Sequence, residues 1–390
     1  MPVRPTVKDG LPPHQQHLLY TLAHADTLIE TVGSTLLEYV AASPLGLDNQ
    51  VQDAREDVVV NSMAPIPQSV PRQAADVINQ LRSALEHALS AEVEYLMGRP
   101  LEAAEEQAIE MPVPKSHPGL SEWFRHKRRR SLPVLHADGV LGQRIASLQP
   151  PFGTEEDQIH PLRVLAEHSN LSKHRKPAEY ALRLGRVIPG YIVPGLRIAG
   201  EYPADRPLRT GDVLASVPAG TCVPLDIWPT VAIRRPHTRE WIVLTHELRA
   251  LESWVRTVAI PTLIAGMSDV EPIPPHLDIS KGYADYSHAL AEAQIMPAAE
   301  RLGLRLAGTG LRYQLPAIFR QALPEASQQA VEDYVAKLSD AAAVEVLERY
   351  MRVRHGRGES HAIGFLRRLL KKVRSSGAAT IAPTEKDRWG

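Results

Sequence analysis

Two short segments of the chain set an acidic residue beside a histidine inside a helical pattern. In the first, Leu81–His87, four residues separate Arg82 from His87. A histidine can move the proton of a 2′-hydroxyl and an arginine can hold the scissile phosphate, so this pair suits metal-independent cleavage of RNA. Residues five apart point roughly 140° apart on an ideal helix. The pair therefore shares a site only where the helix ends, kinks or meets a partner chain.

The spacing of Arg82 and His87 is weak evidence, because an arginine precedes a histidine by four to six residues elsewhere as well, as at Arg130 and His136. A structural alternative is that Glu86 pairs with Arg82 while His87 caps a polar pocket between helices. Both interpretations require a helix that buries Leu81 and Leu85.

The second segment, Glu167–Arg175, gathers an amide and several basic groups near the expected end of a helix. Asn170 and His174 are four residues apart and face the same side of that helix. Lys173 and Arg175 lie where positive charge meets the negative end of the helix dipole. The four residues predict a phosphate or carboxylate site, or else a terminal turn with favourable cations.

The acid–histidine pairs of the chain do not predict a metal site. Glu86-His87, Glu167-His168 and His246-Glu247 are adjacent pairs, and adjacent residues point roughly 100° apart on a helix, so each pair supplies one ligand at most. No Gly-rich phosphate-binding or nucleophile motif occurs either. We expect neither a metal nor a cofactor.

Basic residues cluster in two places. The run Arg125–Arg130 follows Trp123 and Phe124, on which a single strand of nucleic acid could stack, so Arg128, Arg129 and Arg130 are candidate contacts for RNA or another polyanion. The tail Arg349–Arg374 is also basic and amphipathic. It could lie on nucleic acid or on an anionic membrane, or pack with its basic side in solvent.

The elements that must position these residues follow from periodicity. Apolar residues at helical spacing predict helices over 14–42, about 72–96, 161–174 and 241–265. Short apolar runs between Pro and Gly over 182–235 predict a small antiparallel sheet. The expected fold is α+β: mainly a helical bundle, with the small sheet and a C-terminal helical region. The expected division is a bundle carrying both motifs (1–180), a β-rich segment with a packing helix (181–270) and a helical region with a basic tail (276–390).

Composition places the chain among globular proteins. Apolar residues make up 44% of the 390 residues, the formal net charge is −1, and Cys222 is the single cysteine. A lone cysteine fits a reducing cytoplasm and excludes an internal disulfide. The most apolar stretch, Val258–Met267, is too short to cross a bilayer, and no secretory signal follows Met1. We expect a soluble cytoplasmic protein without a transmembrane segment.

The motifs carry two resemblances. Leu-Arg-Ser-Ala-Leu-Glu-His at 81–87, Leu148-Gln149-Pro150 and Asn170-x2-Lys-His-Arg resemble a group of bacterial proteins, frequent in actinobacteria, to which no activity is assigned. The resemblance spans about residues 75–265. A more distant one is to the HEPN superfamily of helical bundles, whose ribonucleases carry Arg-x4-6-His. It implies that Arg82 and His87 are catalytic and that the protein is a homodimer with a composite site. Ser83 follows the arginine in this chain, where those ribonucleases commonly carry Asn, Asp or His.

Two hypotheses follow. The first is an RNA-binding protein of HEPN-like character, or a metal-independent endoribonuclease, with affinity supplied by the basic segments. The second is a non-catalytic interaction protein in which Glu86, His87, Asn170 and His174 form a polar network that fixes helix register. The sequence does not decide whether the protein is an enzyme.

Overall fold

The computed structural model describes residues 11–174, 178–189, 193–198, 206–270 and 273–375. The chain divides into two compact units, residues 1–299 and 300–390, and each is described by itself. The predicted α+β class, mainly helical, is confirmed.

The helices of the first unit, in chain order, are η2 (Pro13–Gln15), α1 (His17–Ala41), α2 (Ser69–Met97), α3 (Ala103–Glu106), α4 (His117–Arg125), η3 (Lys127–Arg129), η4 (Pro133–Leu135), α5 (Val140–Ser147), α6 (Glu155–Ile159), α7 (Pro161–His174), α8 (Leu244–Trp254), the π-helical turn η5 (Val255–Ala259), α9 (Ile260–Ala265) and α10 (Tyr286–Glu292). The four long helices predicted from periodicity are confirmed within a few residues.

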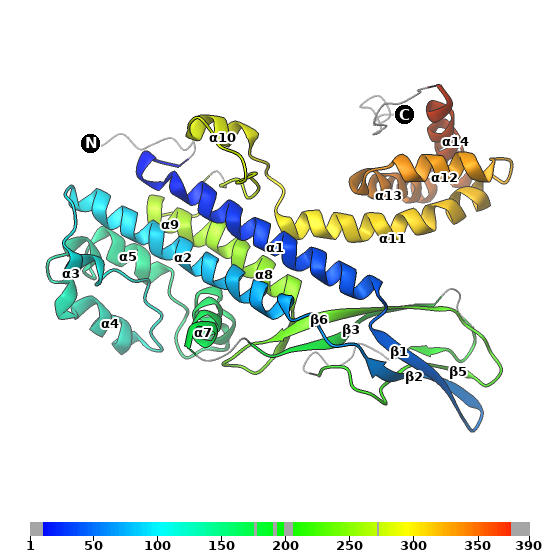
Figure 1. Cartoon of the computed structure of the whole chain (residues 1–390), viewed down its shortest axis with the longest axis horizontal. Helices are drawn as coiled ribbons and strands as arrows, with labels where there is room; N and C mark the ends of the chain where they lie inside the picture. The colour runs from blue at the N-terminus through cyan, green and yellow to red at the C-terminus, as the bar shows by residue number, and fades with distance from the viewer. Residues whose placement is uncertain (1–10, 175–177, 190–192, 199–205, 271–272, 376–390) are drawn as a thin grey trace. The chain divides into compact units, whose positions relative to one another are not determined.

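The core of the first unit lies between α1 and α2, which run side by side (Figure 1). Each buries its predicted apolar stripe, and Leu22, Leu81 and Leu85 are fully buried. Helix α2 ends at Gly98, whose φ of 64° is a left-handed conformation that glycine adopts without strain. Helices α7 and α8 pack against α2, while α3, α4 and α5 gather at the end of the pair away from the sheets (Figure 1).

Two antiparallel sheets are present where one was predicted. The strands are β1 (Leu45–Gln52), β2 (Arg55–Met63), β3 (Tyr180–Pro189), β4 (Arg197–Ile198), β5 (Val213–Pro218), β6 (Leu225–Arg234) and β7 (Trp241–Val243). One sheet has the order β1-β2-β5-β4 and the other the order β3-β6-β7.

The β1–β2 hairpin was not predicted. Its polar first strand exposes most of its side chains, so no alternation of apolar residues marks it. The chain reverses at Asp53, whose φ of 51° is a left-handed conformation that aspartate tolerates better than most residues. The hairpin is completed from a distance, because β2 pairs with β5.

The units do not follow the three-part division expected from the sequence. Leu182, Val231 and Ile233 of the β-rich segment belong to the same core cluster as α1 and α2. Ile273 and Pro274, between the second and third expected parts, also belong to that unit, since Ile273 is buried and Arg256 donates hydrogen bonds to both carbonyls. The boundary falls instead near residue 300, at the start of a long helix.

Up to residue 375, the second unit consists of four helices: α11 (Ala298–Ala322), which begins at the boundary, α12 (Gln328–Lys337), α13 (Asp340–Arg357) and α14 (Glu359–Ser375). The apolar face of basic helix α14 is covered by the core of this unit, with Phe365 and Leu366 buried. An apolar face used in this way is not available to a membrane. Within the described residues, no helix has the length and apolar character needed to cross a bilayer.

Candidate nucleic-acid interface

Arg82 and Glu86 form a clamp on the extended segment that precedes α4. The Arg82 guanidinium lies 2.6 Å from Glu86 Oε1 and donates to the carbonyl of Met111. The other carboxylate oxygen, Oε2, accepts the Met111 N–H at 2.7 Å. Burial raises the pKa of Glu86, although the Arg82 charge opposes that rise. The pairing of Glu86 with Arg82, one part of the predicted alternative, is confirmed, whereas His87, expected to cap a polar pocket between helices, is exposed.

His87 lies on another side of α2 and does not approach Arg82. It is exposed, and its ring centroid is 6.1 Å from that of His17 on α1. Helix α2 continues without a break from Ser69 to Met97, so the five-residue separation keeps the two side chains apart. Within one chain they do not share a site. Joint action would require a second copy of the chain, and the homodimer stays a prediction.

The two motif helices pack against each other as expected. Ser169 Oγ and Ser172 Oγ of α7 donate to Asn79 Oδ1 of α2, at 3.0 and 3.3 Å. Next to the α2–α7 contact, a cavity of about 430 Å³ is lined by Arg82 from α2 and by Asn170 and Lys173 from α7. Both motifs therefore contribute to one cavity.

The structure describes the second motif only in part. The side chain of His174 and all of Arg175 lie outside the described residues. Asn170 and Lys173 are exposed, and so is His87. Among the described residues, the polar link between the motif helices is made by Asn79, Ser169 and Ser172, whereas Glu86 bonds to Arg82 and to the Met111 backbone, so the predicted network is not seen.

A different buried network joins α7 to α8. His168 Nε2 lies 3.5 Å from Glu247 Oε1, and Arg235 donates to both oxygens of Glu247, at 2.8 and 2.7 Å. Burial by itself would raise the pKa of Glu247, but the hydrogen bonds from Arg235 and the nearby His168 imidazole lower that pKa to about 2. Because Arg235 occupies both oxygens of Glu247, this carboxylate belongs to a structural ion pair with Arg235.

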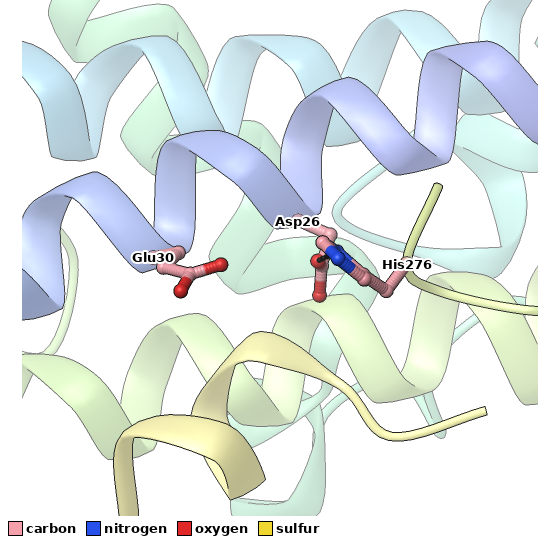
Figure 2. Close-up of side chains that lie close together, drawn as sticks. All are labelled: Asp26, Glu30 and His276. Carbon is pink, nitrogen blue, oxygen red and sulfur yellow. Dashed lines mark hydrogen bonds and ion pairs between the residues drawn. The ribbon is translucent and has the colours of Figure 1, made fainter. Parts of the chain in front are cut away.

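A set of metal-type ligands occurs where the sequence did not indicate one. Figure 2 shows Asp26 and Glu30 on one face of α1, with His276 approaching Asp26 from a distant segment. Their ligand atoms lie within 4.8 Å of one another and could hold a divalent cation. Buried Asp26 already pairs with His276 Nδ1 at 3.2 Å and accepts the Ala298 N–H at 2.6 Å. These bonds account for the cluster as a structural clasp.

The basic segment begins where α4 ends. Arg129 faces inward: its guanidinium lies 3.9 Å from the centroid of the Trp123 ring and 3.1 Å from Glu110 Oε1. Burial lowers the pKa of Arg129, while Glu110 acts in the opposite direction. This predicted RNA contact therefore holds the segment in place and covers one face of Trp123.

The other basic residues of the segment are exposed. Arg125, Lys127, Arg128 and Arg130 form no ion pair with an acidic side chain in the part of the chain that the structure describes. A second cavity, of about 400 Å³, opens among them and is lined by Ser121, Phe124, Arg125, His126, Arg130, His136 and Ala137. Positive charge is therefore concentrated here, and among the described residues no acidic side chain pairs with these four cations.

Hydrogen bonds fix the tautomers of the two histidines in this cavity. His136 Nε2 lies 3.0 Å from the carbonyl of Arg129, which can only accept, so the neutral ring carries its proton on Nε2 and its lone pair on Nδ1. His126 Nδ1 accepts the N–H of Arg128 at 3.3 Å, so its proton is on Nε2. Sequence reasoning noted the spacing of Arg130 and His136 but did not select it; their common cavity distinguishes this pair from Arg82 and His87.

Comparisons with protein-family models, with curated proteins and with solved structures give no match for this chain. The resemblance to the HEPN superfamily therefore stays a prediction. The two cavities and the charges around them are the structural features that bear on function.

Proposed function

We propose that the protein binds single-stranded RNA at the basic cavity beside α4. The observation that carries the proposal is the group of unpaired cations around it. Arg125 and Arg130 line the cavity, and Lys127 and Arg128 are exposed next to it. Exposed cations at such close spacing repel one another, and a phosphate backbone relieves that repulsion while it releases counterions.

An aromatic ring in the same cavity favours nucleic acid over a simple polyanion. Phe124 is half-buried, and the edge of its ring meets Trp123 with a centroid distance of 5.3 Å. A base can stack on such a ring, and stacking tolerates any base sequence. Arg129 covers Trp123, so Phe124 is the expected platform.

The proposal extends to a cytoplasmic location, which the lone Cys222 favours because the cytoplasm keeps cysteine thiols reduced.

The direct test is fluorescence anisotropy with a labelled 20-nucleotide single-stranded RNA. Arg125→Gln/Arg130→Gln should weaken binding at least about tenfold, because it removes two phosphate contacts. The control, Arg72→Gln/Arg209→Gln, removes the same charge from exposed arginines outside the cavity and should bind as the wild type does. Phe124→Leu should also weaken binding, by a factor consistent with about 1–3 kcal/mol of stacking. Equal loss in both double variants would contradict the cavity as the site.

A second candidate function, cleavage of the bound RNA without a metal, is favoured by the tautomer of His136. No hydrogen bond to its Nδ1 is seen among the described residues, so this nitrogen of the neutral ring can take a proton. In the cleavage step, the 2′-oxygen bonds to phosphorus while its proton moves to His136 Nδ1. The P–O5′ bond breaks, and the 5′-oxygen keeps the electron pair and takes a proton from solvent. The products are a 2′,3′-cyclic phosphate and a 5′-hydroxyl, with Arg130 placed to hold the phosphate.

Cleavage is tested with the same RNA in EDTA. His136→Gln can retain a hydrogen bond to the Arg129 carbonyl but lacks the basic nitrogen, so cleavage should slow by roughly 100-fold or more while binding persists. An RNA with one 2′-deoxynucleotide should resist cleavage at that position. Binding without cleavage by the wild type would refute this candidate and leave the binding proposal intact.

A further inference from the structure

Strand β1 forms an open edge of the four-stranded sheet. It is eight residues long and pairs with β2 on one side. The opposite edge, β4, has two residues, and the long edge strand of the other sheet, β3, is covered where the Leu208 N–H donates to the Leu182 carbonyl. In Figure 1 the β1–β2 hairpin runs away from the end of α1. Proteins usually protect such an edge with lysine, proline or a covering segment, and residues 45–52 contain neither lysine nor proline.

The backbone of β1 presents unpaired hydrogen-bonding groups along this edge. Val60 of β2, opposite Leu47, bonds through both its N–H and its carbonyl to residues 211–212, on the far side of β2. Leu47 therefore occupies a non-hydrogen-bonded pair, and its own N–H and carbonyl point outward. The alternation along the strand extends this to Asn49 and Val51. Beyond its pairing with β2, no backbone hydrogen bond of β1 is seen among the described residues.

The side chains of these three residues lie on one face of β1, because alternate residues of a strand share a face. Leu47 is 39% exposed and Val51 is 67% exposed, although both are apolar, and Asn49 lies midway between them. An edge with one apolar residue two positions before its centre and another two positions after it is complementary to a second copy of itself in antiparallel orientation.

The residue types of β1 select one register for such a pair. With a twofold axis at Asn49, Leu47 lies opposite Val51 of the partner subunit, the same contact forms a second time, and Asp48 lies opposite a glutamine. An axis at Asp48 would set two carboxylates opposite each other, and an axis at Gln50 would set polar Asn49 opposite apolar Val51 of the partner subunit. An axis between two residues would oppose outward backbone groups with inward ones.

We infer that the protein forms a homodimer in which the β1 edges of two copies pair in antiparallel orientation about Asn49. The outward backbone groups of Leu47, Asn49 and Val51 then gain partners, and the two four-stranded sheets join into one. The inference does not rest on the proposed RNA site, because that site lies beside α4, at the end of the α1–α2 pair away from the sheets (Figure 1).

Sedimentation velocity of the full chain, at concentrations from about 1 to 200 μM, tests the inference. One pair of strands makes a small interface, so a dissociation constant in the micromolar range is expected. Asn49→Pro removes the outward N–H at the axis and leaves the hydrogen bonds to β2 in place, so it should weaken dimerisation at least about tenfold. Asn49→Ser keeps this N–H and should dimerise as the wild type does.

Disulfide formation measures the register, in a Cys222→Ser background that removes the single native cysteine. In Asn49→Cys the two opposing Cα atoms would lie about 5.5 Å apart, within the range that a disulfide spans, so oxidation with diamide should give the covalent dimer. Val51→Cys is the matched control on the same edge. Its two copies would be offset by four positions, about 13 Å along the strands, and should not form the bond.

Three outcomes would overturn the inference. The first is a monomer at every concentration. The second is a dimer that Asn49→Pro leaves as strong as the wild type, because another surface would then form it. The third is an equal disulfide yield for Asn49→Cys and Val51→Cys. If Asn49→Pro lowers the melting temperature, the two disulfide yields decide, since neither cysteine variant alters the backbone of β1.

Discussion

Removal of Glu86 should show that the first motif is a structural clamp. Glu86→Ala leaves the Met111 N–H without its acceptor at 2.7 Å and Arg82 without its partner at 2.6 Å. A hydrogen bond to a charged group contributes about 1.5–3 kcal/mol. The ion pair adds less than about 1 kcal/mol, because the Glu86 side chain is 30% exposed. The expected loss of unfolding free energy is therefore about 2–4 kcal/mol.

The clamp also predicts that Arg82 and Glu86 are energetically coupled. Both act on Met111 and on each other, so Arg82→Ala/Glu86→Ala should lose about 1–2 kcal/mol less than the two single variants added together. Urea denaturation followed by tryptophan fluorescence measures the unfolding free energy of the first unit, since four of the five tryptophans belong to residues 1–299. Exposed Glu94 on the same helix provides the control, with an expected change within about 0.5 kcal/mol for Glu94→Ala. A coupling free energy below about 0.5 kcal/mol would refute the clamp.

Three further predictions concern buried polar groups. The pKa of Glu247 is lowered from 4.5 to about 2, so the ionised carboxylate stabilises the folded protein above pH 4.5, and this stabilisation is lost as the pH falls toward 2. Glu247→Gln should therefore remove up to about 3 kcal/mol of the pH dependence of the unfolding free energy, measured by acid unfolding. Arg129→Gln should lower the unfolding free energy by about 1–3 kcal/mol, because Trp123 loses its stacked cation, and should reduce RNA affinity less than substitution of the exposed arginines does. Asp26→Ala should cost about 2–4 kcal/mol, because the buried clasp to His276 and to the backbone is lost, while EDTA should leave the wild-type melting temperature unchanged.

Periodicity was sufficient for the helices because burial follows it directly. Helices α1, α2 and α7 begin and end close to their predicted bounds, and α2 packs against α7 as expected. The β1–β2 hairpin could not be found in the same way. Its first strand is mostly exposed, and β2 pairs with β5, about 150 residues later in the chain, so local pattern carries little of the signal.

The candidate site was predicted in part. Arg82, Asn170 and Lys173 do line one cavity, but what distinguishes a clamp from a catalytic pair is the Met111 backbone, whose position no local pattern indicates. Asp26 and His276 show the same limit more strongly, since 250 residues separate them. Spacing along the chain reports which residues share a helix face, and it does not report which loop packs over that face.

The salt dependence of RNA binding tests the central claim most directly. Plots of log Kd against log salt concentration, for the wild type and for Arg125→Gln/Arg130→Gln, count the phosphate contacts that each protein makes. Each contact to a single strand contributes roughly 0.7 to the slope, so loss of two arginines should lower its magnitude by roughly 1.4. The same slope in both proteins, or RNA binding that does not depend on salt, would contradict the account.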